Sequence, residues 1–198
     1  TKPFEGKFLG TAVFSPQCMG DVIGVIMGSF CGDISMIEGT SPWKNRLGEK
    51  VASENFTLSV IPHDSRIVCG EKITEDGYRA ENYDIIKNGV LESFCLSEYA
   101  AKKTGGTRAK SSSSCVAVNA GSKPFEEMLG SIKKGVLVCR FSGGEPANNG
   151  DFSGVAKNSF LIENGKIAYP ISETMISGNF ADMLLKLGVP YNSAEAEK

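Results

Sequence analysis

The dipeptide Asn-Gly occurs at two places where apolar, branched or aromatic residues precede and follow it. The first lies in Asp84–Phe94 (DIIKNGVLESF) and the second in Phe160–Pro170 (FLIENGKIAYP). Asn-Gly accepts positive φ at both central positions of a turn, which the two-residue type I′ β-hairpin requires. The chain is therefore predicted to contain two tight hairpins, and these favour a largely antiparallel sheet.

Helical patterns complete the predicted fold class, which is α+β with a few helices packed on the sheet. Lys123–Gly135 is predicted to be a short amphipathic helix with a glycine just past its end. Its apolar face consists of Phe125, Met128, Leu129 and Ile132.

A C-terminal helix is predicted over Ser177–Gly188, capped by Ser177 or Asn179 and stopped at Gly188-Val189-Pro190. Additional strands are predicted over Lys7–Phe14, Asn55–Val60, Cys115–Gly121 and Val136–Phe141. Strand order does not follow from these patterns.

The apolar segment Gln17–Gly32 contains glycines at positions 20, 24, 28 and 32. A spacing of four places Gly20, Gly24, Gly28 and Gly32 on one face of a helix, although each glycine costs about 1 kcal/mol relative to alanine. We therefore expect a backbone to approach this face closely, either in the chain's own sheet or in a partner subunit. Membrane helix pairs use the same spacing, but this run is short and carries Asp21.

Composition limits the class of partner. The net charge is -2 and the sequence pI is about 5.6, so a basic surface for direct nucleic-acid binding is not expected. No run reaches the ~18 consecutive apolar residues of a membrane span. The six cysteines are scattered without a CxxC spacing, which favours buried, reduced thiols in a cytoplasmic protein over a disulfide framework.

Residues for a self-contained active site are scarce. The one histidine, His63, cannot supply the two imidazoles of an HExxH-like zinc site, and its neighbour Asp64 should point to the opposite face. The serines of Ser111–Ser114 lack an adjacent base, and the polar segment Thr104–Ser114 is predicted to be a mobile loop. No catalytic residue and no metal ligand is therefore assigned to this chain.

The loop Ser142–Gly154 (SGGEPANNGDFSG) is the one segment whose composition suggests a ligand or a partner, because it combines exposed backbone with amide and carboxylate side chains. A long connection between strands is the alternative. The candidate contact residues are Gly143, Gly144, Glu145, Asn148, Asn149, Asp151, Phe152 and Ser153.

Three stretches resemble the TldD/TldE (PmbA) family in the same order along the chain. Phe141–Leu184 resembles its C-terminal signature: a glycine-rich loop, Gly-Asp-Phe-Ser, Glu-Asn-Gly-Lys-Ile, Tyr-Pro-Ile and Ile-Ser-Gly-Asn. Glu81–Gly106 resembles the central hairpin of the family, and Phe14–Gly24 its glycine-spaced helix. The chain is thus expected to be one C-terminal domain, residues 1–190 with a frayed tail at 191–198, and to lack the family's N-terminal domain.

The resemblance implies a function. Family members are cytoplasmic prokaryotic proteins, long labelled modulators of DNA gyrase, that act as metallopeptidases on peptides and small or unfolded proteins. TldD-type members carry HExxxH on the helix that corresponds to Gln17–Gly32, where this chain has MGDVIGVIMG. The resemblance therefore implies a PmbA/TldE-type partner that binds no cofactor itself, with zinc held by a TldD-type catalytic subunit in a heterodimer.

Other interpretations remain open at this stage. A homodimer is one, and an independent peptidase that uses Ser111–Ser114 or a cysteine is another. A third is a protein-binding regulator of DNA gyrase or of a toxin–antitoxin system that performs no proteolysis. In the favoured interpretation the domain lines a peptidase chamber and binds an extended peptide, for which sheet edges are suitable.

Overall fold

The computed structural model describes residues 1–3, 6–143, 146–172 and 174–188 and has the predicted α+β architecture. The helices are α1 Pro16–Val25, the π-helical turn η1 Ile26–Phe30, α2 Asp33–Glu38, α3 Glu98–Thr104, α4 Phe125–Gly130 and α5 Phe180–Leu185. The strands are β1 Lys2–Pro3, β2 Thr11–Phe14, β3 Leu58–Val60, β4 Tyr83–Lys87, β5 Val90–Leu91, β6 Val116–Val118, β7 Lys134–Val138, β8 Arg140–Gly143, β9 Asp151–Lys157, β10 Ser159–Glu163, β11 Lys166–Ser172 and β12 Thr174–Asn179.

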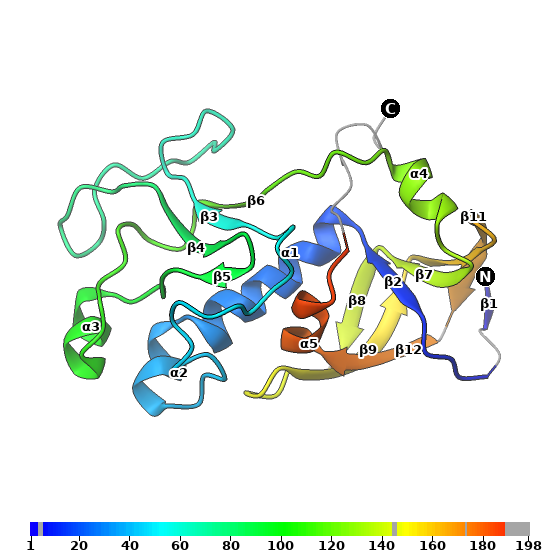
Figure 1. The fold of residues 1–198 in the computed structure, drawn as a ribbon, viewed down its shortest axis with the longest axis horizontal. Helices are drawn as coiled ribbons and strands as arrows, with labels where there is room; N and C mark the ends of the chain where they lie inside the picture. The colour runs from blue at the N-terminus through cyan, green and yellow to red at the C-terminus, as the bar shows by residue number, and fades with distance from the viewer. Residues whose placement is uncertain (4–5, 144–145, 173, 189–198) are drawn as a thin grey trace.

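The strands form three sheets that lie at the two ends of the molecule (Figure 1). One end holds a four-stranded sheet in the order β5-β4-β3-β6. The other end holds a five-stranded sheet, β1-β11-β10-β7-β2, and a three-stranded sheet, β12-β9-β8. Within the described residues only β1–β11 and β2–β7 pair in parallel, so the sheets are largely antiparallel, as the sequence predicts.

Both Asn-Gly hairpins are confirmed. In the turn between β4 and β5, the φ angles of Asn88 and Gly89 are 47° and 82°. In the turn between β10 and β11, Asn164 and Gly165 have φ angles of 49° and 78°. Positive φ at both positions is the signature of the type I′ turn, whose twist matches that of the flanking strands.

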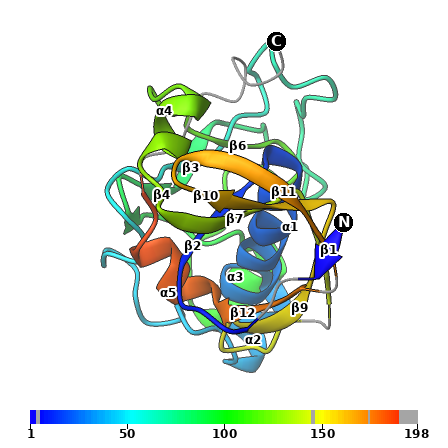
Figure 2. The ribbon, with the colours of Figure 1, turned by 90° about the vertical axis from the view of Figure 1, so that its right-hand side faces the viewer.

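Helix α1 and the turn η1 connect the two ends of the molecule. Cys18, in the first turn of α1, is buried between Val136 of the five-stranded sheet and Ala156 of the three-stranded sheet. Figure 2 shows strands of these two sheets on either side of α1. At the far end of the helical segment, Phe30 packs edge-on against Trp43, with ring centroids 4.8 Å apart.

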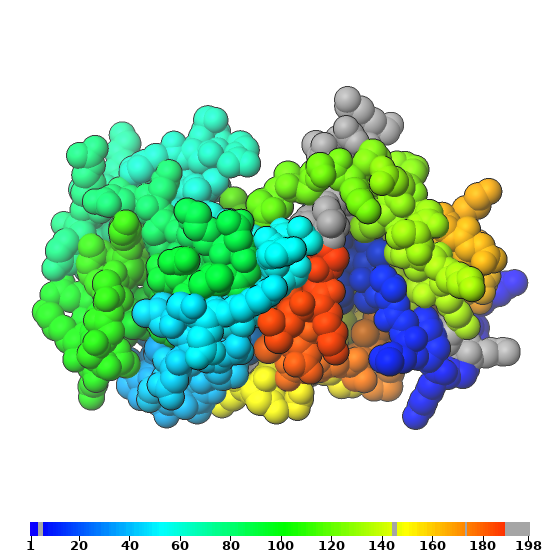
Figure 3. Space-filling view, in the orientation of Figure 1, coloured from blue at the N-terminus to red at the C-terminus, as the bar shows by residue number. Residues whose placement is uncertain are grey.

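The C-terminal helix α5 closes the main core. Leu184 is buried, and its carbonyl accepts a hydrogen bond from the Ser53 N–H at 2.8 Å. In the space-filling view of Figure 3, α5 (red) fills the gap between the segment that contains Ser53 (cyan) and the N-terminal segment (blue). As expected, Asn179 is the N-cap, and its side chain accepts a hydrogen bond from the Asp182 N–H.

Three predicted helices are shorter than expected. The segment Gln17–Gly32 is helical from Pro16, but it passes into the π-turn η1 and ends at Cys31, whose N–H donates to the Ile26 carbonyl. The segment Lys123–Gly135 is helical only to Gly130 because β7 begins at Lys134. Helix α5 begins only after Asn179, since the preceding residues pair with β9, and it ends at Leu185. The expected frayed tail, 191–198, lies outside the described residues.

Several strand predictions also need correction. Only Thr11–Phe14 of the predicted strand Lys7–Phe14 is extended, and Leu58–Val60 is the strand part of Asn55–Val60. Cys115–Gly121 is a strand only over Val116–Val118. The predicted strand Val136–Phe141 is divided at Cys139 between two sheets. Helix α3 was not predicted, although Ser97 caps it and Glu98 pairs with Lys102 one turn later.

Length and apolar composition alone would allow the helical stretch Pro16–Glu38 to cross a membrane. The helix of a protein core meets the same two criteria. Val22, Ile26 and Phe30 of this stretch belong to the main core, which accounts for its apolar composition. The stretch is also interrupted by the π-turn η1 and by Gly32.

Candidate functional site

An apolar groove of about 930 Å³ opens between the two ends of the molecule. Met19 and Ile23 of α1 line it, together with residues of β2, β6 and α4. Its volume lies within the range of ligand sites, ~300–1,000 Å³, so it is large enough for a small molecule or for a peptide segment of several residues. Two cationic side chains, Arg66 and Lys123, are among its lining residues.

Strand β6 forms one wall of the groove with a free edge. The Ile61 N–H donates to the Cys115 carbonyl at 2.8 Å, and the Asn119 N–H donates to the Thr57 carbonyl at 3.1 Å. Backbone groups alternate along a strand, so those of the intervening Val116 and Val118 point away from β3. In the described part of the chain no other strand pairs with this edge.

Strand β2 forms the opposite wall and is the last strand of the five-stranded sheet. Ser15, directly after it, donates its N–H to the Val138 carbonyl of β7 at 3.0 Å. The same alternation directs the backbone groups of Ala12 and Phe14 away from β7. The groove thus lies between two sheet edges, which is the arrangement that binds an extended peptide by strand addition.

The glycine-bearing face of α1 and η1 is exposed. Among the residues that the structure describes, a Cβ atom built on Gly20, Gly24 or Gly28 would meet no atom within 4 Å beyond the helix's own neighbouring backbone. The chain's own sheet therefore does not approach these three glycines. The expectation that this sheet packs closely against the glycine face was wrong. A partner subunit remains the prediction for this face. Gly32 differs, because a Cβ there would lie 2.7 Å from the Gly28 carbonyl oxygen.

The predicted loop Ser142–Gly154 is largely a hairpin. Strand β8 extends to Gly143, strand β9 begins at Asp151, and Gly143 pairs with Gly154. Asn148, Asn149, Asp151 and Ser153 are exposed, whereas Gly144 and Glu145 lie outside the described residues. The tip of the hairpin is therefore still able to contact a partner.

Phe152 was predicted to contact a peptide or a partner, but it is buried in the core. Its ring stacks on Phe180 of α5 with centroids 4.3 Å apart, and it meets Phe141 edge-on at 5.5 Å. Glycines provide the room for this packing, because a Cβ on Gly178 would lie 3.1 Å from the Phe152 ring. Alternation along β9 explains why Phe152 points inward while its neighbours are exposed.

Asn149 and Asp151 have a structural role. The Asn179 side-chain amide donates to the Asp151 carboxylate at 2.8 Å and to the Asn149 carbonyl at 3.0 Å. Asn149 donates to the second carboxylate oxygen of Asp151, also at 2.8 Å. These hydrogen bonds, from Asn179 first and then Asn149, lower the pKa of the Asp151 carboxyl. These hydrogen bonds connect the tip of the β8–β9 hairpin to the N-terminus of α5.

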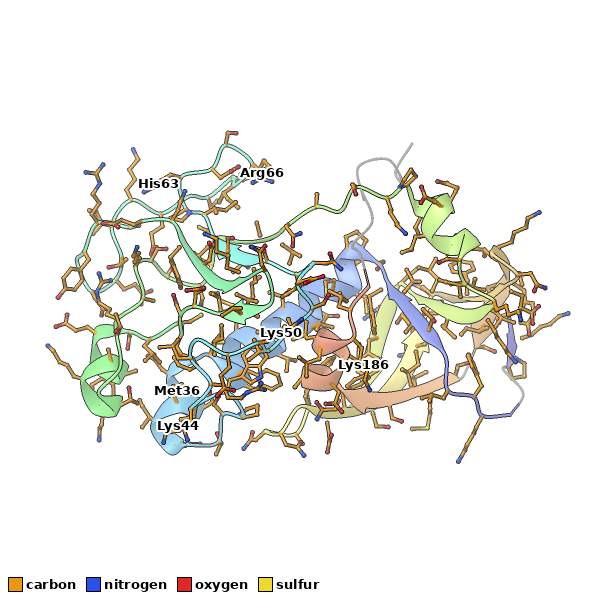
Figure 4. All side chains as sticks on the ribbon, viewed as in Figure 1. Met36, Lys44, Lys50, His63, Arg66 and Lys186 are labelled. Atoms are coloured by element: carbon orange, nitrogen blue, oxygen red, sulfur yellow. The ribbon has the colours of Figure 1, made fainter. Side chains whose placement is uncertain are left out.

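The remaining candidate chemistry is not assembled. His63 lies in an exposed loop, the same part of the chain as Arg66 (Figure 4). Its Nε2 lies 2.7 Å from the Ala80 carbonyl oxygen. Asp64 is bound by Arg66 at 2.7 Å, which lowers the Asp64 pKa to about 2, so it does not orient the histidine. His63 is thus an exposed loop residue without a catalytic partner among the described residues.

The serine segment is fixed rather than mobile. Ser111 is buried and donates its hydroxyl to the Glu81 carbonyl at 3.0 Å, and the nearby Ala109 N–H donates to the Leu96 carbonyl. The hydroxyls of Ser112 and Ser114 lie 2.9 Å from each other. No basic side chain contacts these hydroxyls within the described part of the chain, which weakens the interpretation of an independent serine peptidase.

A metal centre is not formed by the residues that the structure describes: no three His, Cys, Asp or Glu side chains are grouped as ligands. Zinc sites in proteins need three or four such ligands around the ion. The prediction that this chain binds no metal was made from the sequence and stays a prediction.

The fold and the groove together define an α+β domain with an apolar groove between two sheet edges. The sequence model of the PmbA/TldA metallopeptidase C-terminal domain matches residues 6–189, and the chain belongs to this family. It is 31% identical over 177 residues to the "Metalloprotease PmbA" of Escherichia coli O157:H7, covering 86% of this chain and 38% of that protein. The chain therefore spans less than half the length of this relative.

Two relatives of different type come from one organism, Buchnera aphidicola. The chain is 32% identical to its PmbA homolog over 70% of the chain and 32% of that protein. It is 26% identical to its TldD homolog over 77% of the chain and 34% of that protein. Among solved structures, a candidate modulator of DNA gyrase from Bacteroides thetaiotaomicron superimposes with a TM-score of 0.84 at 30% identity, covering 92% of this chain and 42% of that one.

Proposed function

We propose that this chain is the C-terminal domain of a PmbA/TldE-type subunit in a cytoplasmic metallopeptidase complex that cleaves peptides and small unfolded proteins. In this proposal a TldD-type subunit holds the catalytic zinc, and this domain lines the chamber and binds the extended substrate. The observation that carries the proposal is the exposed glycine face of α1 and η1. It occupies the helix on which the resemblance places the HExxxH motif of catalytic members, but this helix contains neither histidine nor glutamate.

The glycines of α1 lower the stability of the helix that contains them. Each glycine in a helix interior costs about 1 kcal/mol relative to alanine. Gly20 and Gly24 of α1 gain nothing in return within the chain, because their Cβ positions face open space. A partner whose backbone lies against this face would use the missing side chains, as closely packed helix pairs do. The existence of PmbA and TldD homologs in one organism agrees with a pair of unlike subunits.

The groove supports the part of the proposal that concerns binding of an extended substrate. Its lining is mainly apolar, and the edges of β2 and β6 offer backbone donors and acceptors on opposite sides. An extended peptide can pair with one edge through its main chain while its side chains enter the apolar interior. Because main-chain pairing does not depend on sequence, such a groove suits unfolded substrates of varied sequence.

Co-expression with a TldD-type subunit tests the assembly. We expect a stable complex in which zinc analysis assigns the metal to the TldD-type subunit. Gly24→Leu should abolish the complex while leaving the free chain folded. Gly130→Leu is a matched control, since a Cβ at Gly130, at the end of α4, also meets open space.

Four outcomes would contradict the assembly. Zinc bound stoichiometrically by this chain alone would remove the non-catalytic role, as would chelator-insensitive cleavage by this chain alone. Normal assembly of the Gly24→Leu variant would remove the glycine face as the contact. Capture of DNA gyrase or of an antitoxin, with no TldD-type subunit, would favour the regulator interpretation.

The groove has its own test. Val118→Pro removes an N–H that points away from β3, so the sheet should tolerate it, whereas strand addition at this edge should be blocked. We expect binding of an unfolded peptide to the assembled complex to weaken several-fold, measured by fluorescence anisotropy. Unchanged peptide binding by a folded variant would show that β6 is not the edge used.

A further inference from the structure

Two of the six cysteines, Cys31 and Cys95, lie side by side although 64 positions of sequence separate them. Cys31 follows the π-turn η1 and is completely buried, and Cys95 lies half-buried just before α3. The Cys95 N–H donates to the Cys31 carbonyl at 3.0 Å. The Cys95 side chain also lies near enough to that of Cys31 to raise the Cys31 pKa, while the Cys95 thiol donates to the Met27 sulfur at 3.9 Å.

The backbone on both sides of the pair is held in place. Two residues further along each segment, the Asp33 carboxylate accepts hydrogen bonds from the Ser97 N–H at 2.9 Å and from the Ser97 hydroxyl at 2.6 Å. The segments that carry the two thiols are thus fixed to each other at two successive points. Disulfides need Cα atoms about 4.4–6.8 Å apart, and a direct backbone hydrogen bond brings the Cα atoms of two residues close to that range.

The other cysteines do not share this geometry. The Cys115 thiol donates to the backbone carbonyl of Cys69 at 3.6 Å, while Cys69 itself is exposed. Cys18 and Cys139 approach each other through Ser15, whose hydroxyl accepts from the Cys18 N–H and donates to the Cys139 carbonyl. Burial raises the pKa of Cys18 to about 11, which leaves little reactive thiolate.

We propose that Cys31 and Cys95 form a dithiol that a low-molecular-weight disulfide, such as oxidised glutathione, converts into an intramolecular disulfide. The half-buried Cys95 attacks one sulfur of the reagent as a thiolate and releases one equivalent of reduced thiol. Cys31 then attacks the Cys95 sulfur of the mixed disulfide and releases the second equivalent. The two cysteines lose two electrons, the reagent gains them, and the two thiol protons end on the released thiols.

The order of attack follows from access. Cys31 is buried, and both the neighbouring Cys95 side chain and this burial raise its pKa well above the usual range. It is therefore a poor first nucleophile and is suited to the second, intramolecular step, in which proximity compensates for the small thiolate fraction. The resulting bond would fasten the end of the glycine-bearing helical segment to the segment that begins α3.

The test is equilibration of the whole chain, without air, in glutathione buffers that range from reducing to oxidising. After alkylation of free thiols, peptide mass spectrometry should find a peptide containing Cys31 linked to one containing Cys95 in the oxidising buffers. Cys95→Ser should abolish this link and leave Cys31 alkylated after denaturation, whereas Cys69→Ser should leave the link intact. Circular dichroism confirms that both variants are folded.

Stability provides a second readout. A disulfide that closes a loop of about 65 residues should shift the folding equilibrium on the order of a thousand-fold towards the native state, and Cys95→Ser should show no such shift between buffers. Accumulation of Cys95 only as its glutathione adduct would overturn the proposal. So would a preferred link between Cys18 and Cys139, or a link between Cys31 and Cys95 that destabilises the fold.

Discussion

Two glycine-rich regions of this domain use the same residue for opposite reasons. In the β8–β9 hairpin, a Cβ on Gly143 would lie 2.5 Å from the Gly154 Cα, so the chain itself requires glycine. On α1 and η1, a Cβ on Gly24 or Gly28 would meet only open space. Contacts within the domain explain the glycines of the first region, whereas no contact among the described residues explains those of the second. The glycines of the β8–β9 hairpin are therefore needed for the fold, whereas those of α1 and η1 mark a candidate contact surface.

The largest effect is expected from Gly154→Ala in the hairpin. The new Cβ would lie 2.7 Å from the Gly143 Cα and would also overlap the Phe141 ring. Because Phe141 packs on the buried Phe152, the strain would reach the core, and we expect a loss of about 1–3 kcal/mol in the free energy of unfolding. Urea denaturation measures it, with Gly130→Ala as the control in open space. Equal stability of the two variants would break the comparison.

A smaller loss is expected from Asn179→Ala, which removes the N-cap of α5 and one donor to Asp151. Loss of such a cap costs about 1 kcal/mol. Ser177→Ala is the matched control, because Ser177 lies two residues earlier, in β12, where it is exposed. If Ser177→Ala were the more destabilising change, the assignment of Asn179 as the cap would be wrong.

Asn179→Ala should also change how the stability of the fold depends on pH. The folded-state pKa of Asp151 is lowered, so its hydrogen bonds stabilise the fold above the pKa of an unfolded aspartate, ~3.9, and this contribution is lost as the pH falls below that value. Stability measured between pH 7 and pH 3 should fall less steeply in Asn179→Ala than in the unaltered chain. Parallel pH profiles would show that Asp151 is not linked to folding.

The smallest effect, and one of opposite sign, is expected from Gly24→Ala. Alanine should stabilise α1 by up to about 1 kcal/mol, because its Cβ meets open space. In the same segment, Gly32→Ala should destabilise, because its Cβ would lie 2.7 Å from the Gly28 carbonyl oxygen. Thermal unfolding of the two variants compares them directly. A destabilised Gly24→Ala would mean that the chain itself needs the glycine face.

The accuracy of the sequence predictions depended on how local the determining interactions are. Asn88-Gly89 and Asn164-Gly165 specify their turns through their own φ preferences, so both hairpins were predicted correctly. The helix at Lys123–Gly135 was predicted too long, because Lys134 and Gly135 pair in a sheet with strands far away in the sequence. Helix propensity is weak compared with such tertiary pairing.

The candidate site was predicted less completely for the same reason. The spacing of Gly20, Gly24 and Gly28 gave their common helix face, but it did not show whether the domain's own sheet covers that face. The groove was not predicted, since its walls β2 and β6 belong to different sheets. The alternation around Phe152 could have indicated a buried strand position in place of a loop contact.

The sequence by itself determined the positions of the two Asn-Gly turns, the shared face of the glycines and the lack of paired imidazoles. Each of these depends on residue identity or on spacing within a few positions. Only the tertiary structure decided that Asp151 and Asn179 fasten a hairpin to a helix, that Cys31 meets Cys95, and that two sheet edges face one groove. Such contacts join residues that are distant in the chain, and their pairing is fixed by the packing of the whole core.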